Sequence, residues 1–527
     1  MSTLPATVIE LLGSGADGAT ALSAPGGVPL TYQQLRHLVT STANALQNSG
    51  IRRNDRVAIV LENGPHAATA FLSVAAAATA APLNPGYRAE EFEFYLLDLK
   101  ARLLIVEAKK SDGDGDGDGD GDKASPAVQV ARKLGVAVAH LTVEPERGAG
   151  AFSLTFPETP TGIKMTTGQP QLGLASADDI ALVLHTSGTT SRPKIVPLTQ
   201  RNVAASARHV RTTLALGPGD RGLNIMPLFH IHGLVAGVLA PLSAGGEVCC
   251  TPGFNALKFF AWMGDVHPTW YTAVPTMHQT ILTRARRNLD IIRANPLRFI
   301  RSSSSALPPQ VLHELEEVFG APAIESYGMT EAAHQMASNP LPPGTRRAGT
   351  VGKAAGPEVC ILDEQGRIAA PGATGEIAIR GPNVTSGYEN NPKANAEAFT
   401  NGWFRTGDQG VMSDDGYVTI TGRLKEIINR GGEKISPREI DEVLMDHPAV
   451  QQCLTFALPH DKLGEDVAAV VVLRDGKETT ETELRDFATR RLADFKVPRK
   501  ILFRAEIPKG ATGKLQRIGL AQKLGLS

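Results

Sequence analysis

The amino-acid sequence predicts a layered α/β fold with a largely parallel sheet, followed by a β-rich segment and a small α+β unit at the C-terminus. Between residues 1 and 110, short apolar runs alternate with helical patterns, as is typical of βαβ units. From residue 349, short strands separated by glycine-rich turns replace this alternation. The pattern changes again near Gly422, and the roughly 100 residues beyond it are enough for a small domain.

The individual elements follow from the spacing of apolar residues. Helices are expected over residues 32–47 and 90–97, and strands over 57–61, 103–106, 180–184, 223–226, 269–273 and 299–302. The Ala-rich run from 67 to 83 is interrupted by Thr, Ser and Pro, so we expect a buried helix there and no membrane span. Another helix is expected after Ser436, which can cap its first turn. Pro437 then takes the first helical position and Glu439 completes a capping box.

Composition bounds the class of protein. With 527 residues, 42% of them hydrophobic and 20% charged, the chain is typical of a globular enzyme with more than one domain. A net charge of −1 provides no general basic surface for nucleic acid or membrane. The four cysteines lack metal-site spacing, which indicates small buried side chains in a reducing compartment.

Two further sequence features concern location and surface. The N-terminus lacks a signal-peptide pattern and the last residues are not a Ser-Lys-Leu peroxisomal address. The cytoplasm is therefore expected, with the peroxisome as the alternative. Residues 112–122 alternate Asp and Gly without the glutamate that closes a calcium-binding EF-hand loop. Because self-repelling carboxylates and glycines do not pack, we expect a solvated surface insertion.

A hydroxyl-rich stretch, His-Thr-Ser-Gly-Thr-Thr-Ser-Arg-Pro-Lys over residues 185–194, follows one of the expected strands. Ser187, Thr189 and Thr190 can surround phosphate oxygens with hydroxyl and backbone N–H groups. Gly188 permits close backbone approach and Lys194 adds a positive charge. The stretch is not a Walker loop. Taken alone, it supports a nucleotide-phosphate site or an ordinary polar loop.

Five stretches occur in a fixed order: this loop, Tyr-Gly-Met-Thr-Glu (327–331), Arg-Thr-Gly-Asp (405–408), Gly-Arg-Leu-Lys-Glu (422–426) and Pro-Lys-Gly-Ala-Thr-Gly-Lys (508–514). Together they resemble the core motifs of the adenylate-forming superfamily, which includes acyl-CoA synthetases, luciferases and peptide-synthetase adenylation domains. Ser191 and Ile195 depart from the glycines that many members have. The resemblance implies an AMP-binding domain over 1–423, a hinge at 424–426 around Lys425 and a mobile C-terminal domain over 427–527.

The resemblance also implies a two-step reaction. A carboxylate attacks the α-phosphorus of ATP to form an acyl-adenylate and pyrophosphate, and the thiol of CoA then displaces AMP. Joining two anions requires cations and N–H donors more than a base. By family position, Thr330 contacts the α-phosphate, Glu331 holds Mg²⁺, and Lys514 bridges the substrate carboxylate and the α-phosphate.

Nucleotide and CoA positions are implied in the same way. Asp408 and Arg423 would bind the ribose, with a purely structural ion pair as the alternative. The other nucleotide-binding positions are Thr186, Ser187, Gly188, Thr189, Thr190, Lys194, Ser304, Glu325, Ser326, Tyr327 and Gly328. Rotation of the C-terminal domain would withdraw Lys514 and bring Gly431, Gly432 and Lys434 toward the thiol channel.

Polar residues occupy the positions where relatives have their acid pocket. These are His230, His232, Ser303 and His334. Imidazoles that can become charged near neutral pH suit a short substrate with a second carboxylate. Wider stretches, including residues 329–336, 380–385 and 428–437, resemble the oxalate–CoA ligases of plants and fungi, which would make oxalate the acid and oxalate degradation the pathway. A medium-chain or aromatic acyl-CoA ligase, a luciferase-like oxygenase and a non-catalytic nucleotide- or RNA-binding protein are the alternatives.

Overall fold

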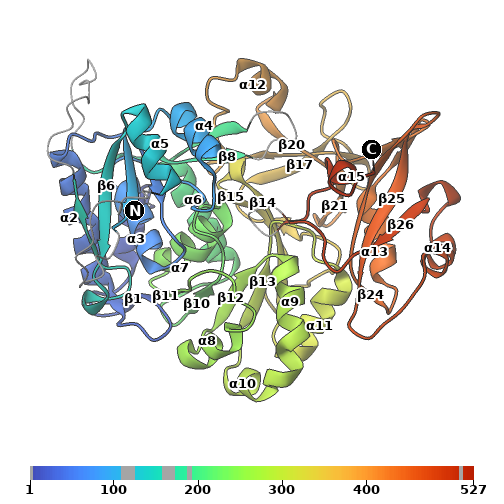
Figure 1. Ribbon diagram of the computed structural model, residues 1–527, viewed down its shortest axis with the longest axis horizontal. Coiled ribbons are helices and arrows are strands. Elements are labelled where there is room, and N and C mark those ends of the chain that lie inside the picture. The colour runs from blue at the N-terminus through green and yellow to red at the C-terminus, as the bar shows by residue number, and fades with distance from the viewer. Residues whose placement is uncertain (1–3, 109–124, 157–172, 187–192, 510–513, 527) are drawn as a thin grey trace, which may run out of the picture.

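The computed structural model describes residues 4–108, 125–156, 173–186, 193–509 and 514–526 (Figure 1). The Asp-Gly run at 112–122 and the phosphate-loop residues Ser187, Gly188, Thr189 and Thr190 lie outside this part of the chain. Within it, no helix is long and apolar enough to cross a membrane. The four cysteines are free and buried, as predicted.

A seven-stranded sheet forms one half of the N-terminal region, in the order β7-β6-β5-β3-β4-β8-β9. Its inner strands are parallel and the two edge strands antiparallel. The strands are β3 (Arg56–Val60), β4 (Thr79–Pro82), β5 (Leu103–Glu107), β6 (Ala137–Val143), β7 (Phe152–Thr155), β8 (Ile180–Thr186) and β9 (Lys194–Thr199). Accompanying helices are α2 (Tyr32–Asn48), α3 (Pro65–Ala75), α4 (Ala89–Leu99), α5 (Pro126–Leu134) and η2 (Pro145–Arg147).

A nine-stranded sheet forms the other half, in the order β16-β15-β14-β13-β12-β10-β11-β1-β2. Its strands are β1 (Thr20–Ser23), β2 (Leu30–Thr31), β10 (Arg221–Asn224), β11 (Glu247–Cys250), β12 (Trp270–Ala273), β13 (Phe299–Ser302), β14 (Ala323–Met329), β15 (His334–Ser338) and β16 (Lys353–Ala354). The helical segments of this half are α1 (Val8–Leu11), η1 (Leu12–Ser14), α6 (Gln200–Thr213), the π-helical η3 (His232–Leu239), α7 (Ala240–Ser243), α8 (Phe259–Val266), α9 (Pro275–Ala285), η4 (Arg286–Asn288), α10 (Leu289–Ala294), α11 (Pro309–Phe319) and η5 (Thr330–Ala332).

Helix α6 joins the two sheets. It contacts β8 and β9 of the seven-stranded sheet and β15 of the nine-stranded sheet. Its side chains Val203, Ala204 and Ala207 are completely buried. The main hydrophobic core therefore runs through this helix and continues across both sheets.

Two five-stranded sheets complete the chain (Figure 1). The first contains β17 (Glu358–Leu362), β18 (Thr374–Arg380), β19 (Phe399–Thr400), β20 (Trp403–Met412) and β21 (Val418–Arg423), with α12 (Pro392–Ala398) beside it. The second, drawn in orange and red, contains β22 (Ile428–Arg430), β23 (Glu433–Ile435), β24 (Val450–His460), β25 (Gly464–Leu473) and β26 (Lys500–Phe503). It is accompanied by α13 (Pro437–Met445), α14 (Glu481–Thr489), η6 (Asp494–Lys496) and α15 (Leu520–Lys523).

The predicted α/β class with β-rich and C-terminal units is confirmed, but two local predictions are wrong. Residues 67–83 are not one helix, because α3 ends at Ala75 and β4 follows, paired in parallel with β3 and β8. Strand pairing here overrides the helix propensity of alanine. Helix α13 does begin after Ser436, but without the capping box. The Ser436 hydroxyl donates to the Thr421 carbonyl, and Glu439 accepts from Lys496 Nζ at 2.7 Å.

Candidate active site

The candidate site lies at the carboxyl ends of the parallel strands of the nine-stranded sheet. Strands β10, β12, β13 and β14 are neighbours or near neighbours in this sheet, so their carboxyl ends share one edge. The histidine-bearing segment follows β10, the serine run follows β13, and Thr330 and Glu331 follow β14. This edge is where open α/β sheets bind their ligands.

The predicted ribose-binding residues are brought together by antiparallel pairing of β20 and β21, which sets Asp408 opposite Arg423. Arg423 Nε donates to Asp408 Oδ1 at 3.0 Å, and Tyr327 Oη donates to the other carboxylate oxygen. The ion pair raises the pKa of Arg423. Because 45% of the Arg423 side chain stays exposed, its remaining N–H groups can still meet a ligand.

Glu331 and Tyr388 form the next pair of side chains, and Glu331 is only 6% exposed. Tyr388 Oη donates to Glu331 Oε1 at 2.8 Å, and burial raises the pKa of the Glu331 carboxyl. The described residues contain no group of three or more His, Cys, Asp or Glu that could hold a metal ion. A single carboxylate of this kind fits Mg²⁺, which is usually held by one or two carboxylates and the substrate phosphates.

Lys514 reaches this region from the C-terminal unit. Burial and, next, the positive charge of Arg423 lower its pKa to about 8, against the opposing effect of the Asp408 and Glu331 carboxylates. Its charge in turn lowers the pKa of His230, His232 and His334. Lys514 therefore lies within electrostatic reach of both the nucleotide residues and the predicted acid pocket.

The acid pocket is organised by a residue that the sequence did not single out, Arg301 of β13. Its Nη1 donates to His232 Nε2 at 3.2 Å and its Nη2 donates to His334 Nε2 at 3.0 Å. The two imidazoles stack with ring centroids 4.9 Å apart. Thr272 Oγ1 lies 2.6 Å from His232 Nε2, and Gln335 Oε1 lies 3.4 Å from Arg301 Nη2.

Arg301 is a buried cation without an anionic partner among the described residues. Its side chain is completely buried, its contacts are neutral acceptors, and its Nε has no hydrogen-bond partner. Burial lowers the pKa of the guanidinium to about 9, which is still above neutral pH. A buried, uncompensated charge of this kind costs free energy, and an anion bound beside it would offset that cost.

The expectation that the pocket imidazoles become charged near neutral pH is wrong. Burial, with the positive charge of Arg301, lowers the pKa of His232 and His334 well below the usual value. In both rings Nε2 accepts from Arg301, which assigns the Nδ1–H tautomer and leaves the His232 Nδ1–H to donate to Ser304 Oγ at 3.0 Å. The positive charge of the pocket therefore comes from Arg301.

Backbone strain surrounds the same pocket. His334 has φ +108°, Ala333 has φ +47° and Ser304 has φ +75°, conformations that non-glycine residues rarely adopt. Asn383 holds the strained turn, since its Nδ2 donates to the carbonyls of Ala332 and Gln335 at 2.8 and 3.0 Å. Strained residues that the surrounding structure holds in place cluster at functional sites.

The other predicted nucleotide residues occupy several environments. Thr186 ends β8 and pairs with Lys194 of β9. Ser303 Oγ donates to the Ser326 carbonyl at 3.0 Å, so its neighbour Ser304, and not Ser303, contacts a pocket histidine. Glu325 Oε1 accepts from Leu307 N, and burial raises the pKa of this carboxyl to about 7. The Ser326 hydroxyl bonds Ser338 Oγ at 2.9 Å.

The C-terminal predictions fall on two turns. Lys425 is exposed in the turn after β21. Gly431 and Gly432, with φ +60° and +102°, form the turn between β22 and β23, and Lys434 is exposed on β23. An isolated antiparallel bridge pairs Lys509 with Leu515, the residue that follows Lys514.

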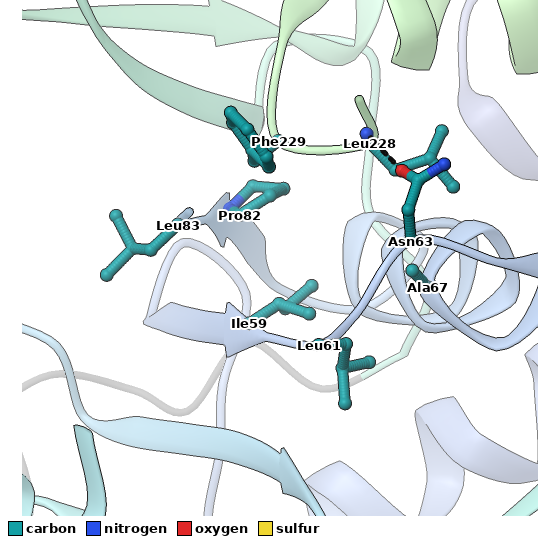
Figure 2. Close-up of a pocket in the computed structure, with 8 residues that line it drawn as sticks. All are labelled: Ile59, Leu61, Asn63, Ala67, Pro82, Leu83, Leu228 and Phe229. Atoms are coloured by element: carbon teal, nitrogen blue, oxygen red, sulfur yellow. Dashed lines mark hydrogen bonds between the residues drawn. The ribbon is translucent and has the colours of Figure 1, made fainter. Parts of the chain in front are cut away.

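A small cavity lies beside the segment that carries His230 and His232. Figure 2 shows its apolar lining, in which Ile59, Leu61 and Leu83 come from the ends of β3 and β4 and Leu228 and Phe229 from the segment itself. Asn63 Oδ1 accepts from Leu228 N at 2.8 Å. Asn63 Nδ2 donates to the Thr251 carbonyl at 3.1 Å. Asn63 thus fixes the start of the histidine-bearing segment against the seven-stranded sheet.

Comparison with known proteins agrees with this arrangement. Residues 14–389 match the model of the AMP-binding enzyme family, and residues 439–514 match that of the AMP-binding enzyme C-terminal domain. The chain belongs to the AMP-binding enzyme family. This AMP-binding enzyme is 44% identical to an oxalate–CoA ligase of Arabidopsis thaliana. The alignment spans 507 residues and covers 95% of each chain.

Two further comparisons extend the result. The AMP-binding enzyme is 40% identical to an oxalate–CoA ligase of Saccharomyces cerevisiae, over 94% of this chain and 93% of that one. The solved structure of ATP-bound MatB from Rhodopseudomonas palustris is similar with a TM-score of 0.84 at 28% identity, covering 99% of both chains. The protein is thus an adenylate-forming acid–thiol ligase that uses ATP and CoA, as the order of its motifs indicated.

Proposed function

We propose that this AMP-binding enzyme is an oxalate–CoA ligase. It would convert oxalate, ATP and CoA into oxalyl-CoA, AMP and diphosphate through an oxalyl-adenylate. The observation that carries the proposal is the buried guanidinium of Arg301, which has no carboxylate partner among the described residues. The distal carboxylate of oxalate would supply the missing anion, in a charge-assisted contact of the geometry that arginine favours.

The size of oxalate also suits the site. Its two carboxylates are directly bonded, so an acid anchored at Arg301 keeps its reacting carboxylate close to the anchor. Lys514 acts electrostatically on His334 and His232, two of the residues that contact Arg301. The anchor is lined by the buried polar side chains of Thr272, His334 and Gln335. An octanoate chain or a coumarate ring would bury Arg301 against carbon, which argues against the medium-chain and aromatic alternatives.

The remaining residues take roles in the first half-reaction. Lys514 would neutralise the reacting carboxylate and the α-phosphate as they approach, and Thr330 would donate to the same phosphate. Asp408 and Arg423 would hold the ribose, while Thr186, Lys194 and the loop between them receive the outer phosphates. Mg²⁺, held at Glu331, would supply positive charge for the phosphates.

The second half-reaction requires a different arrangement of the C-terminal unit. We place the N-terminal domain at 1–423, the hinge at 424–426 around Lys425, and the mobile domain at 427–527. Rotation about the hinge would remove Lys514 and bring Gly431, Gly432 and Lys434 to the thiol channel. Since Lys514 moves with its own domain, one movement would end adenylation and open the path for CoA.

The test is pyrophosphate release with ATP, Mg²⁺ and CoA across oxalate, malonate, acetate, octanoate and 4-coumarate. Oxamate serves as a matched control, because it keeps the shape of oxalate but replaces one carboxylate with a neutral amide. We expect kcat/KM for oxalate to exceed that of every other acid by about tenfold or more, about 1.4 kcal/mol or more. A preference for octanoate or coumarate would overturn the oxalate assignment, and turnover of oxamate equal to oxalate would remove Arg301 from its role.

A further inference from the structure

The loop after β18 is fastened to both sides of the nucleotide site. Thr385 N donates to the Glu331 carbonyl at 2.7 Å, and Thr385 Oγ1 donates to the carbonyl of Pro197 in β9 at 2.8 Å. Glu389 N donates to the carbonyl of Ile195, also in β9, at 3.1 Å. The loop therefore connects β9, the strand that follows the predicted phosphate loop, with the turn that carries Glu331.

Tyr388 of this loop contacts the functional side chains of both. Its hydroxyl donates to Glu331 Oε1 at 2.8 Å. The Nζ of Lys194, the first residue of β9, lies 4.3 Å from the centroid of its ring, within cation–π range. Among the described residues, Tyr388 joins the predicted metal carboxylate to the lysine at the end of the phosphate loop.

The position of Tyr388 is itself well fixed. Its backbone N donates to Asn395 Oδ1 at 2.7 Å, and Asn395 Nδ2 donates to its carbonyl at 2.8 Å. The ring packs against Phe404 of β20 with centroids 6.2 Å apart, and only 9% of the residue is exposed. Burial and the adjacent Glu331 carboxylate raise the pKa of Tyr388, so its hydroxyl remains a proton donor.

A buried tyrosine with a satisfied hydroxyl is common in protein cores, and Tyr417 of this chain is one. Its hydroxyl donates to the Thr345 carbonyl, its ring lies under Arg347 and Lys353, and it is 4% exposed. Tyr388 differs because its hydroxyl meets a carboxylate at the adenylation centre. A hydrogen bond to one carboxylate oxygen fixes the rotation of the carboxylate and leaves the second oxygen as a ligand.

We propose that Tyr388 is a positioning residue for magnesium-bound ATP. Its hydroxyl holds the Glu331 carboxylate in the rotamer that binds the cation, and its ring holds the Lys194 ammonium at the end of the phosphate loop. One side chain thus fixes the positions of both charged groups. The inference rests on the adenylation roles proposed for Glu331 and Lys194, and it does not depend on the identity of the acid.

The test compares Tyr388→Phe, which keeps the ring and removes the hydroxyl, with the matched control Tyr417→Phe. ATP binding is measured by calorimetry without any acid, once with Mg²⁺ and once with EDTA. For Tyr388→Phe we expect Kd for ATP with Mg²⁺ to rise about tenfold, about 1.4 kcal/mol, and Kd in EDTA to change less than twofold. The Mg²⁺ concentration for half-maximal binding should rise as well, and Tyr417→Phe should match the wild type in every measurement.

Two results would overturn the proposal. Unchanged binding and unchanged Mg²⁺ dependence of Tyr388→Phe would show that the hydroxyl does not position Glu331. An equal loss of ATP affinity with Mg²⁺ and with EDTA would indicate a merely structural role, as would a lowered melting temperature accompanied by such a loss. Because the assay contains no acid, failure of oxalate turnover in the wild type would leave this test intact.

Discussion

At the scale of a single residue, Arg301 is the buried cation of the predicted acid pocket. The two histidines that the sequence offered as charged substrate ligands are neutral acceptors that orient the guanidinium. Their contribution is to hold the planar guanidinium in a fixed direction at a buried position. Electrostatic interactions inside such a site are stronger than in water.

Replacing Arg301 with Met keeps an unbranched apolar stem and removes the guanidinium with its charge. We expect kcat/KM for oxalate to fall about 100-fold or more, about 2.7 kcal/mol, with KM for ATP changed less than twofold. The folded state should persist, because removing an unpaired buried charge relieves a desolvation cost. The measurement is initial-rate kinetics with each substrate varied in turn, with Arg346→Met at a partly exposed ion pair as control. Unaltered oxalate kinetics would contradict the anchoring role.

The roles of individual residues could be predicted only where the motif is continuous in sequence. Roles could be predicted for Asp408, Arg423, Glu331 and Lys514 because each belongs to such a stretch, and these roles remain predictions. Arg301 and Tyr388 were missed because their partners come from distant segments, His232 and His334 in one case and Lys194 and Glu331 in the other. The residues next to an arginine in an apolar strand do not indicate which distant side chains it will contact in the folded protein. Likewise, the contact of Ser304, and not Ser303, with His232 depends on a backbone conformation that composition does not reveal.

The turn from β14 to β15 is the element whose geometry shapes the pocket. Gly328 lies on β14, where the chain passes so close to β15 that an added Cβ would be 1.9 Å from the His334 carbonyl oxygen. The neighbouring atom is backbone and cannot move aside without shifting the histidine. The glycine that was predicted from its nucleotide motif is therefore also required by packing.

Gly328→Ala should consequently destabilise the protein and displace His334. We expect a loss of about 1–3 kcal/mol in the free energy of unfolding, the usual range for overpacking, together with weaker oxalate binding. Gly217→Ala is the matched control, since nothing lies within 4 Å of its added Cβ and its φ is not in the left-handed region. Denaturant unfolding of the two variants checks the expectation, and equal stabilities would contradict it.

Elements themselves were predicted well where one pattern extended over many residues. The helix expected over 32–47 is α2 at Tyr32–Asn48, and the strand expected over 57–61 is β3 at Arg56–Val60. The Ala-rich run was predicted wrongly because alanine favours a helix, whereas the pairing of β4 with β3 and β8 that overrides this preference involves segments distant in sequence. The capping box at Ser436 was predicted wrongly because the Thr421 carbonyl of β21 takes the hydrogen bond of its hydroxyl.

At the scale of the whole molecule, the packing of the C-terminal unit determines the charge state of Lys514. Burial lowers the pKa of this lysine from 10.5 to about 8. The proton is therefore held below pH 8 and lost as the pH rises through that value. We expect kcat/KM for adenylation, measured by pyrophosphate exchange without CoA, to be level below pH 8 and to decrease about tenfold per pH unit above it.

The Lys514→Ala variant supplies the control for this pH dependence. It should lose adenylation and with it the descending limb, yet it should still transfer the acyl group from a supplied acyl-adenylate to CoA. A descending limb that survives in the variant would assign the titration to another group. Equal loss of both half-reactions would contradict the proposal that Lys514 acts only in adenylation and that the C-terminal domain rotates before the transfer to CoA.

The guanidinium of Arg301, which has no anionic partner among the described residues, bears on which acids the proposed ligase would activate in a cell. Acetate and fatty acids are common metabolites, and each could in principle be activated at the expense of ATP. A site built around a buried charge rejects an acid that lacks the matching group by leaving that charge unsatisfied, a penalty that can reach about 10⁴-fold to 10⁵-fold. Discrimination of this size would let the proposed oxalate–CoA ligase work without a proofreading step that removes wrongly activated acids.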